Sequence, residues 1–141
     1  TQRGGDDRDE VVVVAAALTK QIEAIMATQD ADTGMWWTVP NRPGETYLET
    51  SCGGLFAFGM ARAWRYGHAG DEVLPHIKEA IRGLKSKIVA DADGPKVTGT
   101  SLGTGVGGFD NYAAVGVGDD VPFGIGAALL GLVETSGLPL P

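Results

Sequence analysis

The stretch Gln29-Asp30-Ala31-Asp32-Thr33-Gly34-Met35-Trp36-Trp37 decides how the first half of this chain is organised. Two adjacent tryptophans directly after an Asp/Gly turn make a poor core segment. They make a good carbohydrate platform, because a flat aromatic face stacks on the apolar face of a sugar ring and the indole N–H supplies a polar edge. Trp36 and Trp37 are therefore candidate sugar-binding residues. The alternative is that the tryptophans pack within the loop, and we expect one of them to pack and the other to stack on sugar.

The spacing of apolar residues predicts a helix on each side of this turn. Between residues 9 and 28 apolar side chains recur three and four positions apart, which is the helical period. Residues 30–45 are expected to form a loop, because they contain several Gly and Pro residues. Thr46 and Glu49 then match the capping-box pattern, which opens a second helix ending near Gly67. Glu49 is thus either a helix-capping residue or a contact to a sugar hydroxyl or a water.

The second half of the chain is expected to hold two helices separated by a glycine-rich loop. A third helix is predicted over residues 71–89, whose apolar residues face one way. Half of the 22 glycines lie between Gly94 and Gly131. The loop at residues 91–120 is long enough to be a candidate site, with a candidate short strand at 96–101. A fourth helix is predicted over residues 121–134. Asp119 or Asp120 is expected to cap this helix. Gly124, Gly126 and Gly131 are expected to let a neighbouring helix approach closely.

Charge and cysteine content exclude several classes of function. The net charge is −7, from 18 acidic and 11 basic residues, and no basic cluster interrupts the acidic balance. We therefore expect neither a nucleic acid nor an anionic membrane surface as a partner. The longest apolar run, at residues 11–18, is too short to span a membrane. The single cysteine, Cys52, excludes an internal disulfide framework and a cysteine-based zinc site, and we interpret it as a small core residue.

Three short motifs resemble cofactor or metal sites but lack the necessary context. Residues 103–108 match the dinucleotide pattern G-x-G-x-x-G, yet no strand–helix alternation surrounds them. The acidic turn at residues 30–34 lacks the glycine and the glutamate that a calcium loop requires further on. His68 and His76 have no other potential ligands beside them in the sequence. We therefore expect no cofactor and no metal.

Four groups of residues, in this order and spacing, resemble the C-terminal part of glycoside hydrolase family 105, the unsaturated rhamnogalacturonyl and glucuronyl hydrolases. The resemblance extends from about Asp6 to Leu130. The groups are Gln29-Asp30 with Thr33-Gly34-Met35-Trp36, then Tyr47-Leu48-Glu49-Thr50-Ser51, then the helix through Ala57 and Ala61 to Tyr66-Gly67, and then Val97-Thr98-Gly99-Thr100.

The resemblance implies a fold and an activity. Family members fold as an (α/α)6 toroid, so residues 1–141 are expected to be one all-α segment of about four helices arranged as hairpins, with a long glycine-rich loop. Members act on unsaturated uronic-acid oligosaccharides: they hydrate the C4=C5 bond, and the product rearranges and releases the next sugar. An aspartate acts as general acid and base, which requires a carboxyl group beside a positioned water. In the family this aspartate precedes the first matching motif, so we expect no catalytic residue within this chain.

The resemblance also implies binding residues and partners. The expected contacts to an oligosaccharide are Trp36, Trp37, Glu49, Ser51 and Thr100. The expected helices cannot close a ring and would leave apolar surface exposed, so the partner would be the missing N-terminal part of the toroid or a second copy of the chain. A non-catalytic helical module for carbohydrate binding or assembly, of the same ancestry, is the alternative. Whether the protein is cytoplasmic or secreted stays open.

Overall fold

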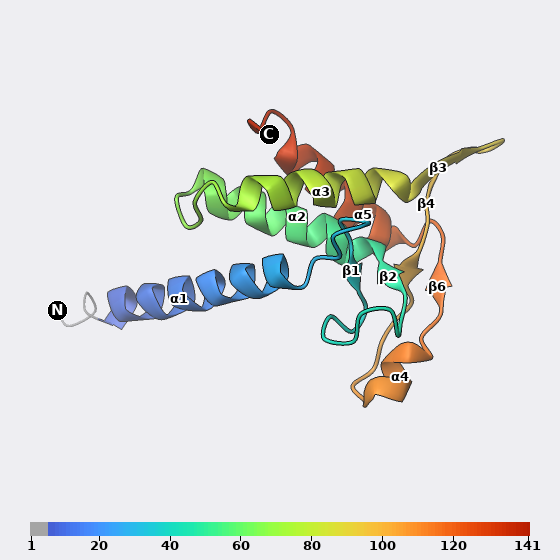
Figure 1. Cartoon of the computed structure of the whole chain (residues 1–141), viewed down its shortest axis with the longest axis horizontal. Helices are drawn as coiled ribbons and strands as arrows, with labels where there is room; N and C mark the ends of the chain where they lie inside the picture. Colours follow the sequence, from blue (N-terminus) through green and yellow to red (C-terminus); the bar gives the residue numbers. More distant parts are fainter. Residues whose placement is uncertain (1–5) are drawn as a thin grey trace.

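The computed structural model describes residues 6–141, with side chains from residue 10 onward. Within this part of the chain five helices are joined by three two-stranded antiparallel ribbons (Figure 1), which confirms the predominantly helical class predicted from the sequence. In chain order the elements are α1 (Asp6–Ala27), β1 (Trp36–Trp37), β2 (Leu48–Glu49), α2 (Thr50–Arg65), α3 (Val73–Ser86), β3 (Ile88–Asp91), β4 (Gly94–Val97), β5 (Thr100–Ser101), α4 (Phe109–Ala113), β6 (Val117–Gly118) and α5 (Pro122–Thr135).

Helices α2 and α5 pack backbone against backbone. A Cβ atom on Gly131 would lie 2.7 Å from the carbonyl oxygen of Gly54, and a Cβ on Gly54 would overlap the carbonyl of Ala127. Such contact is possible only because these glycines have no side chain. The predicted close approach at Gly131 is therefore confirmed. Gly124 instead faces the side chain of Thr100, and Gly126 has open space where a Cβ would be.

The core lies between α2, α3 and the strand that contains Trp36. Trp36 is fully buried, and its Nε1 donates a hydrogen bond to the carbonyl oxygen of Ile25 at 2.7 Å. Its ring meets Phe56 edge to face, with 5.0 Å between the ring centroids. Met60 of α2 and Ile77 of α3 are buried in the same cluster. The expectation that Trp36 offers a face to sugar is therefore wrong, because that ring fills the core.

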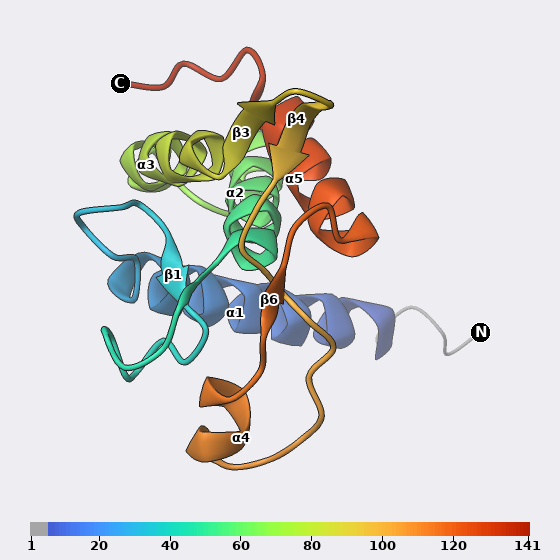
Figure 2. The same ribbon diagram turned by 90° about the vertical axis from the view of Figure 1, so that its right-hand side faces the viewer.

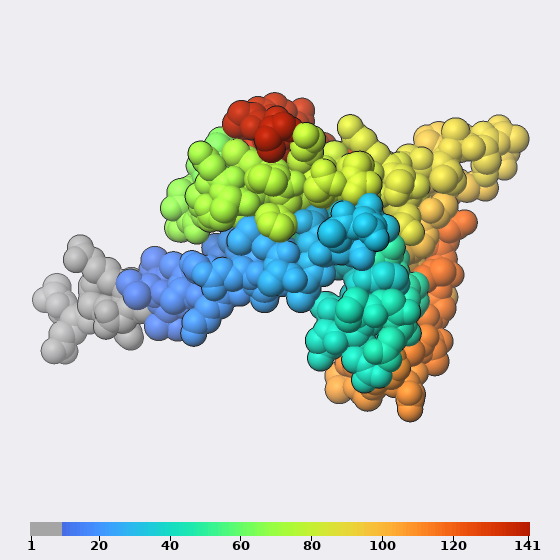
Figure 3. All heavy atoms as spheres, in the orientation of Figure 1, coloured from blue at the N-terminus to red at the C-terminus, as the bar shows by residue number. Residues whose placement is uncertain are grey.

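Helix α1 is anchored only near its C-terminal end. Ile22 is 4% exposed and belongs to the core, whereas the four valines at 11–14 are each about two-thirds exposed. The N-terminal half of α1 extends away from the other helices (Figures 2 and 3). In the described part of the chain no helix has the length and apolarity needed to cross a membrane.

The start of α2 differs from the predicted capping box. Glu49, not Thr46, is the N-cap residue, and its carboxylate accepts hydrogen bonds from the backbone amides of Ser51 and Cys52. A carboxylate at the N-cap position, just before the helix begins, satisfies backbone donors that would otherwise lack partners. The helix therefore begins at Thr50, three residues later in the chain than a Thr46 cap would place it.

The limits of α3 and α5 also differ from the sequence prediction. Helix α3 ends at Ser86, and Ile88 pairs with Val97 in a ribbon instead of continuing the helix. Helix α5 has Val121 as its N-cap residue and no side-chain cap. The carboxylate of Asp120 accepts a hydrogen bond from the Val97 amide at 2.9 Å instead, so the predicted aspartate cap is wrong.

The glycine-rich stretch holds more structure than the predicted loop. β3 and β4 form a hairpin, β5 pairs with β6, and α4 lies between the last two strands (Figure 2). The predicted strand at 96–101 is split into β4 and β5 by a turn at Gly99, whose φ of 74° favours glycine. This segment crosses the N-terminal end of α2, where it forms one side of a cavity.

Candidate functional site

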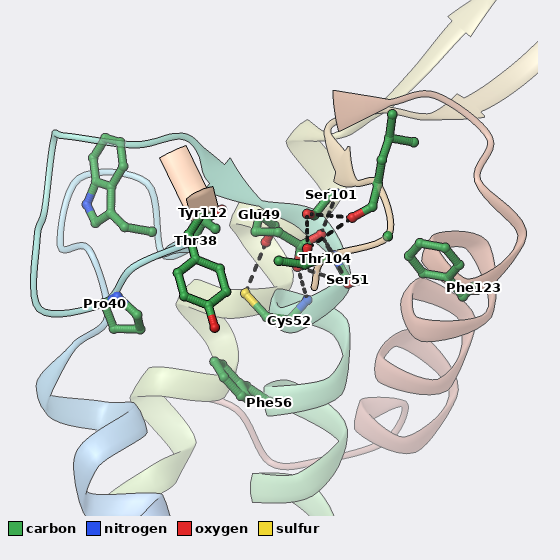
Figure 4. A pocket seen from close by; sticks show the side chains of 13 residues that line it. Thr38, Pro40, Glu49, Ser51, Cys52, Phe56, Ser101, Thr104, Tyr112 and Phe123 are labelled. Atoms are coloured by element: carbon green, nitrogen blue, oxygen red, sulfur yellow. Dashed lines mark hydrogen bonds between the residues drawn. The ribbon is translucent and has the colours of Figure 1, made fainter. Parts of the chain in front are cut away.

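A cavity of about 420 Å³ opens where β1, the start of α2 and the glycine-rich segment meet (Figure 4). Phe123, at the start of α5, lines one side of the cavity, and Tyr112 and Pro40 line the opposite side. The polar residues lie between these two sides. Aromatic and hydroxyl side chains make up most of its wall. The 13 lining residues are Trp37, Thr38, Pro40, Glu49, Ser51, Cys52, Phe56, Ser101, Leu102, Gly103, Thr104, Tyr112 and Phe123.

The carboxylate of Glu49 is the centre of the polar wall. It is only 6% exposed and accepts hydrogen bonds from the amides of Ser51 and Cys52, at 3.1 and 2.7 Å. It also accepts from the Ser51 hydroxyl, at 2.9 and 3.0 Å to its two oxygens, and from the Ser101 amide at 2.9 Å. A buried carboxylate is tolerated when donors satisfy it in this way. Glu49 therefore joins the start of α2 to the wall formed by β5.

Neighbours of Glu49 hold the same wall. The hydroxyl of Tyr47 donates to Ser101 Oγ at 2.8 Å. The amide and the hydroxyl of Thr50 donate to the carbonyl oxygens of Gly99 and Thr98, at 3.2 and 2.7 Å. These bonds connect residues about 50 positions apart in the sequence. The position of residues 98–101 beside α2 thus depends on a small set of polar contacts.

The structure brings together three of the five residues expected to bind sugar. Trp37, Glu49 and Ser51 all line the cavity. Trp36 lies in the core, and Thr100 is fully buried against Gly124, so neither lines the cavity. The Glu49 carboxylate is already engaged by protein donors.

Two lining groups were not predicted from the sequence. Tyr112 belongs to the short helix α4, and Phe56 and Phe123 come from α2 and α5. The hydroxyls of Ser101 and Thr104 form the other missed group. The motif Val97–Thr100 directly precedes Ser101, so extending that motif by a few residues would have found it. The aromatic residues carried no comparable local signal.

Cys52 lines the cavity but is not a nucleophile in this setting. Its Sγ donates to the carbonyl oxygen of Glu49 at 3.2 Å. Burial, and then the negative charge of the Glu49 carboxylate, raises the pKa of the thiol well above its ordinary value. The thiol therefore keeps its proton at neutral pH, and only the thiolate is strongly nucleophilic.

One indole N–H group and one hydroxyl group of the lining residues have no hydrogen-bond partner within the described part of the chain. These are Trp37 Nε1 and Thr38 Oγ1. Among the described residues no group of three His, Cys, Asp or Glu side chains could hold a metal ion. Besides the engaged Glu49 carboxylate, the wall offers aromatic faces and hydroxyl groups, which suit stacking and hydrogen bonding with a polyhydroxylated ligand.

Comparison with known proteins identifies relatives over nearly the whole chain. Residues 6–138 match the family model described as Glycosyl Hydrolase Family 88. The comparison with curated proteins returned no match. Solved structures also superpose with the chain, among them the following three. Two are possible members of glycoside hydrolase family 105, from Klebsiella pneumoniae (32% identity, TM-score 0.79) and Salmonella enterica (30% identity, TM-score 0.79). Each match covers 95% of this chain and 33% of the longer protein.

The third structure is a family 105 glycoside hydrolase from C. acetobutylicum, with 23% identity and a TM-score of 0.81, and its match covers 89% of this chain and 38% of that protein. At that identity the likeness concerns the fold alone. The chain thus spans between a third and two-fifths of the length of these structures. The resemblance to family 105 that the sequence predicted is confirmed by these neighbours. The chain, matched over residues 6–138, belongs to glycosyl hydrolase family 88.

Proposed function

We propose that this chain forms a sugar-binding wall of a glycoside hydrolase that acts on unsaturated uronic-acid oligosaccharides. The observation that carries the proposal is the cavity, where Trp37 and Tyr112 supply aromatic surface and Ser51, Ser101 and Thr104 supply hydroxyl groups. Sugars combine apolar ring faces with hydroxyl edges, so this combination matches their chemistry. The reaction would be hydration of the C4=C5 bond, as in the family 105 enzymes that the sequence resembles.

We further propose that the aspartate acting as general acid and base lies outside residues 1–141. A proton-transferring carboxyl group must be within hydrogen-bond reach of the substrate and be able to exchange its proton. Glu49 is the one carboxylate among the cavity-lining residues, and four protein donors occupy it. That arrangement supports a structural role for Glu49 and a catalytic group elsewhere.

The exposed apolar faces of α1 and α5 support a partner made of further helices. Phe123, Leu130 and Val133 lie along one stripe of α5 and are 55%, 47% and 71% exposed. The valines of α1 are similarly uncovered. Apolar patches of this kind mark interaction surfaces. Because the matched structures are about three times as long as this chain, we propose that the remaining helices of a toroid cover these faces.

The function is tested by measuring binding and turnover separately on the purified 141-residue chain. An unsaturated uronic-acid disaccharide is added, and its ultraviolet absorbance is followed while saturation-transfer NMR reports binding. We expect transfer to the sugar ring protons and constant absorbance. Loss of absorbance would contradict the placement of the catalytic acid outside the chain. Absence of transfer, with the chain folded by circular dichroism, would contradict the sugar-binding wall.

The covering of the apolar faces is tested by light scattering after size-exclusion chromatography. We expect association or poor solubility of the isolated chain, and we expect Leu130→Lys with Val133→Lys to reduce it. The matched control is Lys substitution at Ala90 and Ala92, which are exposed in the β3–β4 hairpin and belong to neither α1 nor α5. A stable, soluble monomer that is insensitive to these changes would contradict the proposal. A defined dimer would indicate that a second copy supplies the cover.

A further inference from the structure

The segment between β5 and β6 is anchored at its base and has few contacts beyond it. Residues 103–115, which we call the flap, contain α4, and none of the five residues of that helix is buried. Residues 102–108 are all exposed, Val106 completely. Helix α4 projects from the helical body in both ribbon views (Figures 1 and 2). A segment with so little buried surface belongs to the least stable parts of a fold.

The base of the flap is held by backbone pairing. β5 pairs with β6, and the Leu102 amide donates to the carbonyl oxygen of Gly116 at 2.9 Å. The Ser101 amide, at the end of β5, is bound in turn to the Glu49 carboxylate. A surface loop whose two ends are joined in this way has the form of an Ω-loop. A Cβ on Gly103, the first residue beyond this base, would meet no heavy atom within 4 Å, so its backbone is free to turn.

A single arginine ties the far part of the flap to the loop at residues 38–45. The guanidinium of Arg42 lies 4.3 Å from the ring centroid of Phe109, the first residue of α4. Two hydrogen bonds to Glu45, at 2.5 and 2.7 Å, hold that guanidinium in place. The Glu45 hydrogen bond raises the pKa of Arg42, and the charge of Asp110 in α4 adds to this. Within the described part of the chain, no other cation–π contact, hydrogen bond or ion pair links residues 105–115 to residues outside the flap.

The flap supplies part of the cavity wall. Three lining residues belong to it, and these are Gly103, Thr104 and Tyr112. Tyr112 lies on the same side of the cavity as Pro40, which belongs to the loop that carries Arg42 (Figure 4). The contact of Arg42 with α4 therefore fastens together the two segments that border this side. Movement of the flap would take Tyr112 out of the wall and open the cavity toward Cys52, another lining residue.

We propose that residues 103–115 open and close this side of the cavity, turning at the base of the flap, and that Arg42 on Phe109 is the latch that holds the flap closed. An exposed cation–π contact is weak, so losing it should change the ratio of open to closed flap by only about threefold. A latch of this strength lets ligands exchange without unfolding the chain. The proposal concerns access to the cavity, whichever ligand binds there, and so goes beyond the sugar-binding function.

The test uses Cys52 as a reporter, because it is the single cysteine of the chain and lines the cavity. The rate at which iodoacetamide labels its thiol in the 141-residue chain measures how often the cavity is open. Arg42→Met keeps a long side chain but removes the charge, and it should label about threefold faster. Phe109→Leu should have the same effect, and the double variant should label no faster than either single variant, because both substitutions remove one shared contact.

Arg82→Met is the matched control, because Arg82 is equally exposed and pairs with Glu79 three positions away, as Arg42 does with Glu45. It should leave the labelling rate unchanged. Urea denaturation should give equal stability for all variants, and hydrogen exchange at the Leu102 amide should stay as slow in Arg42→Met, because the base remains paired. Equal labelling of Arg42→Met and Arg82→Met, faster labelling explained by lost global stability, or labelling of the unmodified chain at the rate of the unfolded chain would each overturn the proposal. No sugar is present, so none of these outcomes bears on the proposed sugar-binding function.

Discussion

Trp36 and Trp37 are neighbours in β1, yet they lie in two regions that are built differently. Trp36 is fully buried among apolar side chains, and its indole N–H has a partner in the carbonyl of Ile25. Trp37 is half-buried, lines the cavity, and has an indole nitrogen without a partner in the described part of the chain. Successive side chains of a strand point to opposite faces. The same residue type therefore serves the core on one face and a candidate site on the other.

The two regions also differ in what holds them together. On the core side, apolar packing and the backbone contact of Gly54 with Gly131 leave no room for an added atom. On the cavity side, the wall is positioned by hydrogen bonds from Tyr47, Glu49 and Thr50. Changes in the core should therefore affect folding, whereas changes in the wall should affect the local order of the wall and ligand binding.

The largest expected effect separates the two tryptophans. Trp36→Ala should lower the free energy of unfolding by about 4 kcal/mol, because it leaves a cavity in a packed core. Trp37→Ala should cost about 1 kcal/mol, since its ring is only partly buried, but it should abolish sugar binding. Urea denaturation and saturation-transfer NMR on both variants measure these effects. Equal losses of stability would remove the distinction between the two regions.

The core side should reject a single methyl group at the helix contact. Gly54→Ala forces a Cβ into the Ala127 carbonyl and should cost about 3 kcal/mol, because overpacking displaces the backbone. Gly59→Ala lies in the same helix with open space at its Cβ position, and should stabilise the chain by about 0.5 kcal/mol. Thermal unfolding of the two variants gives the comparison. Tolerance of Gly54→Ala would show that α2 and α5 can move apart.

A substitution on the cavity side should increase local mobility of the wall without unfolding the core. Glu49→Gln replaces a carboxylate by an amide whose NH2 group would face the donors of Ser51 and Ser101, and it should cost about 2 kcal/mol. Hydrogen exchange of the Ser101 and Cys52 amides should accelerate, while that of the α3 amides should change little. Glu45→Gln, on the exposed loop, is the control for charge loss. Unchanged exchange at Ser101 would contradict the role of Glu49.

The smallest expected effect is on the pH dependence of stability. Because the pKa of Cys52 is raised in the folded chain, its thiol keeps a proton at a pH where the unfolded chain releases it. This contribution to stability is complete below the ordinary value of 9.0 and declines as the pH rises above it, because the unfolded state then binds fewer protons. At one pH unit above that value, the free energy of unfolding should be lower by about 1 kcal/mol. The Cys52→Ala variant should not show this decrease. Identical pH profiles of the two proteins would contradict the shift.

Much of the helical framework could be predicted from the sequence, because helical periodicity is a local signal. The apolar spacing gave α1, α2, α3 and α5 to within a few residues. The predicted start of α2 is three residues too early, because Glu49 fits two local patterns. It can be the glutamate that follows a Thr46 cap by three residues, or it can be the N-cap residue itself. Only the positions of the Ser51 and Cys52 amides distinguish them.

The wall of the cavity was less predictable, because its structure depends on distant contacts. β5 consists of two residues, and its place is determined by Glu49, Thr50 and Tyr47 across about 50 positions of sequence. The secondary-structure propensity of single residues does not predict pairings between such distant positions. The same reason explains Thr100, which the motif suggested as a contact but which packs under Gly124.

The central claim, that the Trp37 side of β1 forms a sugar site, is tested most directly by amide NMR of the labelled chain during titration with methyl β-D-glucoside. The account predicts shifts at Ser51, at residues 101–104 and at the Trp37 indole, with the Trp36 indole and the amides of Leu130 and Val133 unchanged. Shifts confined to the exposed faces of α1 and α5, or no shifts at saturating sugar, would contradict it.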